Sequence, residues 1–116
     1  MNKLIEQIKQ WGNDRGITGP NGRGTLLGQL SKTQEELTET RDAAVEWMLT
    51  DPDAIYMLGV NSLAQIKDGI GDCTVTLILA AELAGLDLED CLRYAYDEIK
   101  GRTGRMENGT FVKNSK

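Results

Sequence analysis

The chain has 116 residues, enough for one domain with a core, and its 40% hydrophobic content is typical of a folded protein rather than a disordered one. Eighteen acidic and thirteen basic residues give a net charge of −5, which argues against general binding to the nucleic acid backbone. The chain contains no histidine, so acid–base chemistry would fall to carboxylates, lysine, tyrosine or metal-bound water. No signal peptide and no apolar run long enough to span a bilayer are evident, which predicts a cytoplasmic protein without a membrane partner.

Four stretches repeat apolar residues at the spacing of an α-helix, which predicts an all-α fold. They cover residues 2–13, about 25–48, about 62–84 and about 88–101. Asn61 and Asp87 are expected to cap the third and fourth helices at their N-termini, and Gly85 is expected to end the third. A glycine-rich loop over 16–25 and a connection over 50–61 join the first three helices.

Each of the two long helices carries an apolar stripe that is expected to face the core. On the second helix the stripe is Leu26, Leu30, Leu37, Ala44 and Met48. On the third helix it is Leu63, Ile66, Ile70, Cys73, Leu77, Ala81 and Ala84. Cys73 and Cys91 are expected to be reduced core residues rather than a disulfide or a metal pair. The second half of the third helix is apolar on most sides, so a second subunit is expected to cover it in a homodimer or homotetramer.

Two pairs of acidic residues recur at the spacing of one helical turn. Glu36 and Glu39 are three residues apart, and Asp68 and Asp72 are four apart, so each pair lies on one face of its helix. Like charges placed in this way repel one another unless a cation lies between them. Ligands that offer only oxygen atoms suit a hard divalent ion, so the pairs predict a Mg2+ site. Glu35 is expected to point further toward solvent.

These acidic pairs, carried in this order on two long helices, resemble the MazG-type all-α nucleoside triphosphate pyrophosphohydrolases, a superfamily that includes the dimeric dUTP pyrophosphatases. The family pattern is E-x-x-E followed, after a gap, by E-x-x-D, and its acidic residues bind Mg2+. Glu36 and Glu39 match the first half, and Asp72 takes the final aspartate position. Gly69 stands where the family has glutamate, and Asp68, one residue earlier, is the stand-in.

The run from Tyr96 to Lys113 looks like the end of short, phage-type MazG-like proteins. In the family an asparagine, a lysine and an arginine near this point bind the triphosphate. Lys100, with Arg102 or Arg105, fits the charged roles. Asp97 occupies the asparagine position, where a carboxylate could instead be a further ligand for the metal or the ribose.

The resemblance implies a four-helix subunit over residues 1–102 that completes its core by oligomerisation, followed by a basic, Gly- and Asn-rich tail over 103–116. It implies a Mg2+-dependent enzyme, with Mn2+ as a substitute, that cleaves a nucleoside triphosphate between the α- and β-phosphates. The products are a monophosphate and pyrophosphate. One of the three residues Glu35, Glu36 and Glu39 would orient or deprotonate the attacking water. Further candidate contacts to the substrate are Lys32, Trp11 and Trp47. The two tryptophans would stack on the base, and simple packing in the core is the alternative interpretation for both.

Two other functions stay open. Acidic helices commonly carry only solvated charge, so the chain could be a non-catalytic helical adaptor on the same scaffold. The same acidic cluster could also serve a metal-dependent phosphohydrolase of another nucleotide, such as an alarmone. Gly69 and Gly71 likewise have two interpretations, close helix packing or room for ions beside Asp68 and Asp72.

Overall fold

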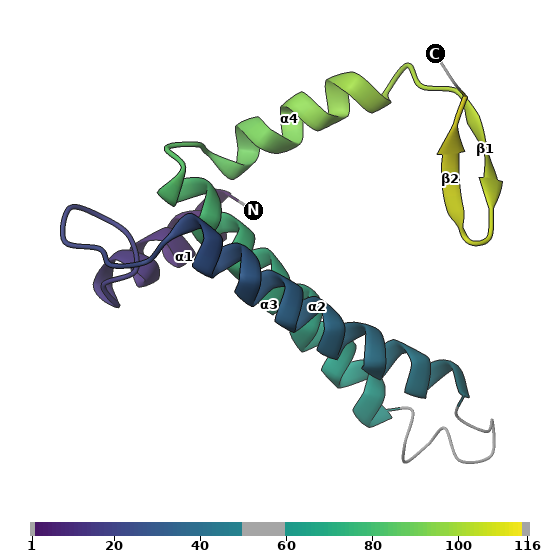
Figure 1. Ribbon diagram of the computed structural model, residues 1–116, viewed down its shortest axis with the longest axis horizontal. Helices are drawn as coiled ribbons and strands as arrows, with labels where there is room; N and C mark the ends of the chain where they lie inside the picture. The colour runs from purple at the N-terminus through teal and green to yellow at the C-terminus, as the bar shows by residue number, and fades with distance from the viewer. Residues whose placement is uncertain (1, 50–59, 115–116) are drawn as a thin grey trace. The chain divides into compact units, whose positions relative to one another are not determined.

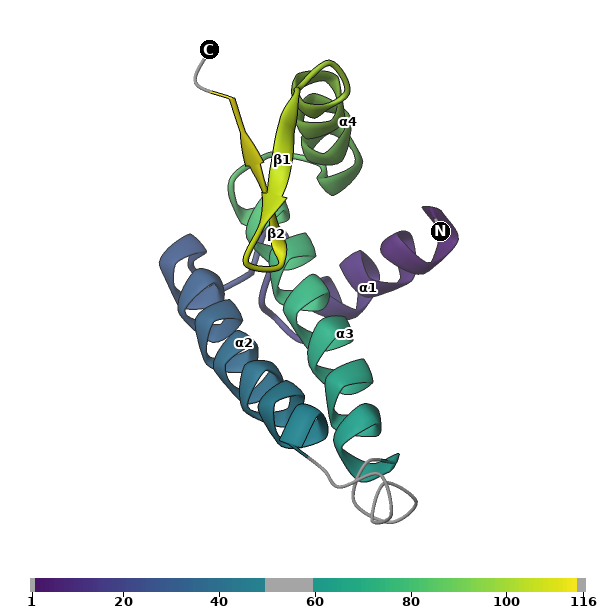
Figure 2. The same ribbon diagram turned by 90° about the vertical axis from the view of Figure 1, so that its right-hand side faces the viewer.

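The computed structural model describes residues 2–49 and 60–114, and its side chains from residue 61 onward in the second range (Figures 1 and 2). The helices are α1 (Asn2–Asp14), α2 (Leu26–Leu49), α3 (Val60–Leu83) and α4 (Leu88–Ile99), and the strands are β1 (Gly104–Glu107) and β2 (Thr110–Lys113). The predominantly helical class is therefore confirmed, with a small antiparallel sheet added. The chain divides into two compact units, Met1–Leu86 and Asp87–Lys116.

Helices α2 and α3 lie side by side and run in opposite directions (Figures 1 and 2). The Thr33 hydroxyl forms a hydrogen bond with the Thr76 hydroxyl, and Thr40 lies against Gly69. A later residue of α2 thus contacts an earlier residue of α3, as antiparallel helices require. Buried and half-buried residues continue the line of these contacts along each helix in alternating steps of three and four, as in a coiled coil. We call this line the seam. It consists of Gln29, Thr33, Glu36, Thr40 and Ala43 on α2, and of Ser62, Ile66, Gly69, Cys73, Thr76 and Ala80 on α3.

The seam is made mainly of small and hydroxyl-bearing residues, and only Ile66 and Cys73 of the predicted apolar stripes belong to it. The Thr33 and Thr76 hydroxyls are 2.7 Å apart and also contact the carbonyls of Gln29 and Cys73 at 2.9 and 2.8 Å. Each hydroxyl has a single hydrogen, so the two hydrogens are shared among these three contacts. Small side chains allow the two backbones to approach closely, which explains why the seam excludes leucine.

The prediction that the apolar stripes form the core of the chain is wrong for most of their large residues. On α2, Leu37 is 57% exposed and Met48 is 74% exposed. On α3, Ile70 is 60% exposed, and Leu63 and Leu77 are exposed as well. Ala81 of the α3 stripe is buried as predicted. The other buried apolar side chains among the described residues lie outside both stripes: Ile5, Ala43, Ile78, Leu79 and Ala80.

Helix α1 packs against the second half of α3, where the sequence is apolar on most sides. Gly12 allows this contact, because a Cβ atom at this position would lie only 2.4 Å from Cδ2 of Leu79. The Lys9 ammonium forms an ion pair of 3.2 Å with Glu82. Thus α1 is fixed to α3 by one close backbone approach and by a charged contact beside it.

The sequence predicts the C-terminal end of α3 correctly but not its N-terminal end. Gly85 ends the helix as expected: its φ angle is +73°, and the amides of Gly85 and Leu86 donate to the carbonyls of Glu82 and Ala81. Asn61 is not the N-cap, because α3 already includes Val60. Most of the predicted connection over 50–61 lies outside the described residues.

The second unit consists of α4 and the hairpin β1–β2. Asp87 caps α4 as predicted, its Oδ1 accepting a hydrogen bond of 3.4 Å from the Glu89 amide. The hairpin turns at Asn108 and Gly109, both with positive φ angles, as a two-residue hairpin loop requires. Both cysteines are free thiols, but Cys91 is exposed, so its predicted place in a core is wrong.

No single helix within residues 2–49 and 60–114 is long and apolar enough to cross a membrane. The bent pair Asn61–Leu83 and Leu88–Ile99 would satisfy length and composition when taken together, as core helices of other proteins also do.

Candidate functional site

The predicted acidic residues of α2 and α3 line one shared cavity of about 290 Å3. We call it the acidic cavity. Its walls are Glu36, Glu39, Thr40, Gln65, Asp68, Gly69 and Asp72. The structure therefore brings together all four residues that the sequence assigns to a metal.

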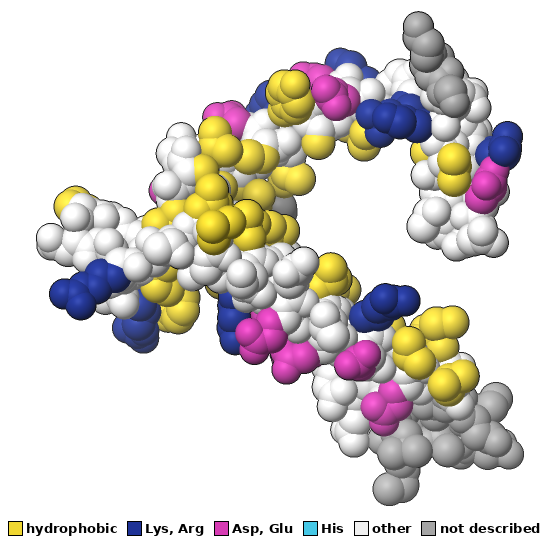
Figure 3. Space-filling model, in the orientation of Figure 1, with side chains coloured by type: hydrophobic (Ala, Val, Ile, Leu, Met, Phe, Trp, Pro, Cys, Tyr) yellow, Lys and Arg dark blue, Asp and Glu magenta, His cyan; other side chains and the backbone are white. Residues whose placement is uncertain are grey.

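The antiparallel seam explains this convergence. Glu39 lies three residues after the seam residue Glu36, and Asp72 lies three residues after the seam residue Gly69. Residues with the same offset from the seam fall on the same side of an antiparallel helix pair. The reason is that a two-fold axis perpendicular to the plane of the two helix axes relates one helix to the other. Figure 3 shows acidic side chains gathered along one edge of the helical pair.

Gly69 belongs to the seam and offers no room for a side chain. A Cβ atom built there would lie 1.9 Å from Oγ1 and 2.8 Å from Cβ of Thr40. Gly71, two residues on, has no neighbouring atom within 4 Å of such a Cβ. Of the two interpretations of Gly69, the geometry thus favours close packing. Asp68, the stand-in for the family glutamate, lines the acidic cavity.

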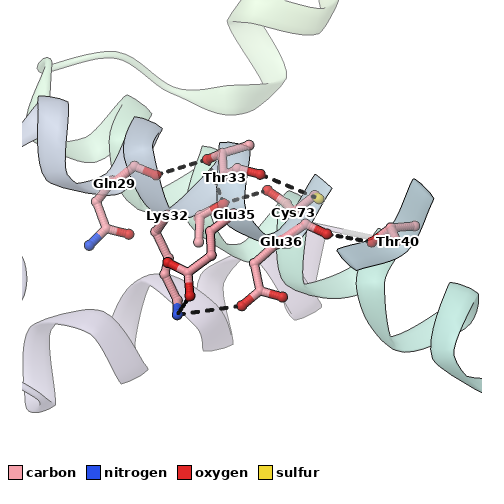
Figure 4. Close-up of polar contacts among 8 residues, drawn as sticks. Gln29, Lys32, Thr33, Glu35, Glu36, Thr40 and Cys73 are labelled. Atoms are coloured by element: carbon pink, nitrogen blue, oxygen red, sulfur yellow. Dashed lines mark hydrogen bonds and ion pairs between the residues drawn. The ribbon is translucent and has the colours of Figure 1, made fainter. Parts of the chain in front are cut away.

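Lys32 forms ion pairs with Glu35 and Glu36, the two glutamates that precede Glu39 (Figure 4). Its Nζ atom lies 3.3 Å from Oε1 of Glu35 and 3.6 Å from Oε1 of Glu36. Glu35, followed by Glu36, raises the pKa of Lys32 above 10.5, mainly through the hydrogen bond and the charge of Glu35. The Glu35 side chain is 62% exposed and that of Glu36 only 17%. Glu35 lines neither the acidic cavity nor the larger one beside it.

The larger cavity, of about 620 Å3, adjoins the acidic cavity and shares Glu36 and Asp72 with it. We call it the tryptophan cavity. Trp11 and Lys32, both predicted as substrate contacts, line it, whereas Trp47 does not. Arg15 lies over the Trp11 ring, 5.7 Å from its centroid. Its other walls come from the glycine-rich loop and from α2 and α3: Ile17, Arg23, Gly24, Thr25, Gly28, Gln29, Val75, Thr76 and Leu79.

The basic residues predicted near the C-terminus lie in the second unit. Lys100, Arg102 and Asp97 line a cavity of about 590 Å3 that Lys113 also borders. Lys100 forms an ion pair of 3.2 Å with Asp97. Arg105 instead pairs with Glu107 on the same strand and lies outside this cavity. Sequence patterns did not single out Arg23 or Gln29: Arg23 lies in the glycine-rich loop, whose path no periodicity describes, and Gln29 is a single polar residue in the first turns of α2.

The donor atoms of the acidic cavity suit Mg2+, because they are carboxylate oxygens with a hydroxyl and an amide nearby. The side chains are nevertheless not gathered into a ready coordination shell: within the described residues no three Asp, Glu, Cys or His side chains are arranged to hold a metal ion. Glu36 is engaged by Lys32. Binding of an ion would therefore require the carboxylates to turn toward one another by changes of rotamer.

Comparisons with protein-family models, with curated proteins and with solved structures find no match to this chain. The fold and the two cavities thus define a helical protein with an acidic site beside an aromatic one, and the MazG-type resemblance rests on the residues named above.

Proposed function

We propose that the protein is a nucleoside triphosphate pyrophosphohydrolase that uses Mg2+, or Mn2+ in its place, and releases a nucleoside monophosphate and pyrophosphate. The observation that supports this function is the acidic cavity, in which carboxylates from α2 and α3 converge. The tryptophan cavity beside it is large enough, at about 620 Å3, for a small-molecule ligand.

Charge balance explains why the substrate and the acidic cavity would require a cation. A triphosphate and a group of carboxylates repel each other, and bound Mg2+ would neutralise both and lower the pKa of a coordinated water. Glu39, Asp68 and Asp72 have no ion-pair partner among the described residues and are the proposed ligands. Glu36, held by Lys32, is the proposed group that orients the water or accepts its proton.

The tryptophan cavity supplies the remaining contacts. Trp11 offers an aromatic face on which a base can stack, and Gln29 offers an amide for its polar edge. Arg23 and Lys32 carry the positive charge that phosphate oxygens require. Lys100 and Arg102 form a separate basic group in the second unit, and Arg102→Ala tests their role in phosphate binding.

The test is an assay of the full chain against a panel of ribo- and deoxynucleoside triphosphates, with and without Mg2+, that distinguishes pyrophosphate from orthophosphate. Asp72→Asn removes one proposed ligand. Asp42→Asn is the matched control, because Asp42 is an exposed aspartate on α2 outside both cavities. We expect Mg2+-dependent pyrophosphate from the wild type and from Asp42→Asn, and none from Asp72→Asn.

Other products would identify the competing functions. Orthophosphate release would point to a phosphohydrolase of another nucleotide. No turnover of any nucleotide by the folded protein with Mg2+ would contradict the enzyme and favour a binding protein on this scaffold.

A further inference from the structure

Lys32 lies where the two cavities of the first unit meet. It lines the tryptophan cavity but not the acidic cavity, and its ammonium forms an ion pair with Glu36, which lines both. Figure 4 shows this ammonium between the carboxylates of Glu35 and Glu36. A single cation is therefore shared by two glutamates, and one of them belongs to the proposed metal site.

The ion pair between Lys32 and Glu36 is loose. The distance of 3.6 Å between Nζ and Oε1 exceeds the roughly 2.7–2.9 Å of a strong hydrogen bond between an ammonium group and a carboxylate. A lysine four residues before a glutamate is also the less favourable order on a helix, since the helix dipole favours the reverse. The Lys32 side chain is 50% exposed, so water can replace Glu36 around the ammonium. Lys32 can thus leave Glu36 at a small cost in free energy.

Glu36, by contrast, requires a cation nearby. Its side chain is only 17% exposed, and Glu39, Asp68 and Asp72 line the acidic cavity with it. Repulsion among these carboxylates is screened less at a half-buried group than in open water. Lys32 is the ion-pair partner that Glu36 has within the described part of the chain. A divalent ion that enters the acidic cavity would therefore have to compete with the ammonium.

We propose that Lys32 is an exchangeable counter-ion of Glu36, which it leaves for a phosphate group of the substrate when one enters the tryptophan cavity. Lys32 already lines that cavity, and phosphate oxygens are strong charged acceptors for an ammonium group. The exchange would release Glu36 to the acidic cavity and remove the charge that opposes a divalent ion there. Lys32 is thus a positioning residue that couples binding of the triphosphate to binding of the metal. This inference rests on the proposed function, from which it takes both ligands.

The first test is the affinity of the nucleotide-free full chain for Mn2+, measured by electron paramagnetic resonance of the free ion. Lys32→Met removes the ammonium and keeps a flexible, unbranched side chain. Lys67→Met is the matched control, because Lys67 is an exposed lysine next to Asp68 that lines neither cavity. We expect Lys32→Met to bind Mn2+ at least about threefold more tightly than the wild type, and Lys67→Met to change the affinity by less than about twofold. Lys32→Arg keeps the charge and should bind Mn2+ as weakly as the wild type.

The second test measures the substrate side of the exchange, where the expected change has the opposite sign. At saturating metal, Lys32→Met should raise the KM for a nucleoside triphosphate by at least about threefold, because the phosphates lose a charged donor. Arg23→Met removes another cation of the tryptophan cavity and should raise KM without tightening Mn2+ binding. A merely structural role of Lys32 would weaken the binding of both ligands.

The outcomes separate this inference from the proposed function. Mn2+ binding that Lys32→Met leaves unchanged, or that Lys67→Met strengthens equally, would overturn the exchange and leave the enzyme standing. An unchanged KM in Lys32→Met would overturn it as well. A wild type that does not bind Mn2+, or that binds it no better than Asp72→Asn, would contradict the proposed metal site and this inference with it.

Discussion

Lys32 is the residue whose charge is most clearly set by its neighbours. Glu35 and then Glu36 raise the pKa of its ammonium group above 10.5. We therefore expect Glu35→Gln to lower the pKa of Lys32, and Glu36→Gln to lower it less, as followed by NMR titration of the labelled side chain. Equal shifts in both variants, or none, would contradict the assignment of Glu35 as the main partner.

The same pKa shift sets the sign of the pH dependence of stability. A lysine whose pKa is raised in the folded state stabilises the fold fully below its ordinary pKa of 10.5, and loses that contribution as the pH rises through the folded value. The contribution of the ion pair to the unfolding free energy should therefore stay constant from neutral pH up to pH values just below the pKa of free lysine. Loss is expected only in strongly alkaline solution.

Gly69 and Gly71 form a natural pair for testing helix packing. Both lie inside α3, where alanine normally stabilises by about 0.5–1 kcal/mol relative to glycine. We expect this gain for Gly71→Ala, since nothing lies within 4 Å of the added methyl group. Gly69→Ala should instead lower the unfolding free energy by about 1–3 kcal/mol, because its methyl group collides with Thr40. Chemical denaturation measures both, and equal effects would show that α2 and α3 do not approach closely at Gly69.

At the scale of the helices, the bond between Thr33 and Thr76 joins α2 to α3. Each single valine substitution should cost about 1 kcal/mol of unfolding free energy, because it leaves the other hydroxyl without its partner across the seam. The double substitution should cost less than the sum, since valine has the shape of threonine and no group then lacks its partner.

Thr38 and Thr74 provide the control for this double-mutant cycle, in which the two single valine substitutions are compared with their combination. Each hydroxyl donates to a carbonyl four residues earlier on its own helix, at 3.0 and 2.8 Å, and both residues are exposed. Their valine variants should show no coupling. Coupling of similar size in both cycles would mean that the effect comes from the helices rather than from the seam.

The helices themselves could be predicted from periodicity because their ends carry strong signals. Gly85 and Asp87 mark the end of α3 and the cap of α4, and the structure uses both. The hairpin was missed, although Asn108 and Gly109 are the usual pair for a two-residue turn, because the flanking strands are only four residues long.

The core face of α2 and α3 could not be predicted from hydrophobicity alone. Each helix has two neighbouring lines of seven-residue spacing, one small and polar through Thr40 or Gly69, the other apolar through Leu37 or Ile70. Hydrophobicity favours the apolar line, whereas close approach of two backbones requires the small one. Only the partner helix decides between them.

The acidic cavity was predictable to a greater extent than the tryptophan cavity. Spacing places Glu39 on the same face of α2 as Glu36, and Asp72 on the same face of α3 as Asp68. Arg23, by contrast, reaches the tryptophan cavity through the glycine-rich loop, whose path no periodicity describes.

At the scale of the whole molecule, the converging carboxylates should make stability depend on divalent ions. A ligand that binds only the folded state stabilises it by about 2.7 kcal/mol at one hundred times its dissociation constant. We expect Mg2+ to raise the thermal midpoint of the wild type, and to have a much smaller effect on Asp72→Asn. Removal of metal by a chelator should reverse the gain. An equal response of both proteins would show that Mg2+ does not bind at the acidic cavity.

The route of the chain through the first unit also has a consequence for folding kinetics. Thr40 and Gly69 meet between helices that follow one another, whereas Gly12 meets Leu79 only after the chain has passed through all of α2. Closing the shorter loop costs less chain entropy, so pairing of α2 with α3 would precede docking of α1. Changes at Gly69 would then slow refolding, and changes at Gly12 would mainly accelerate unfolding.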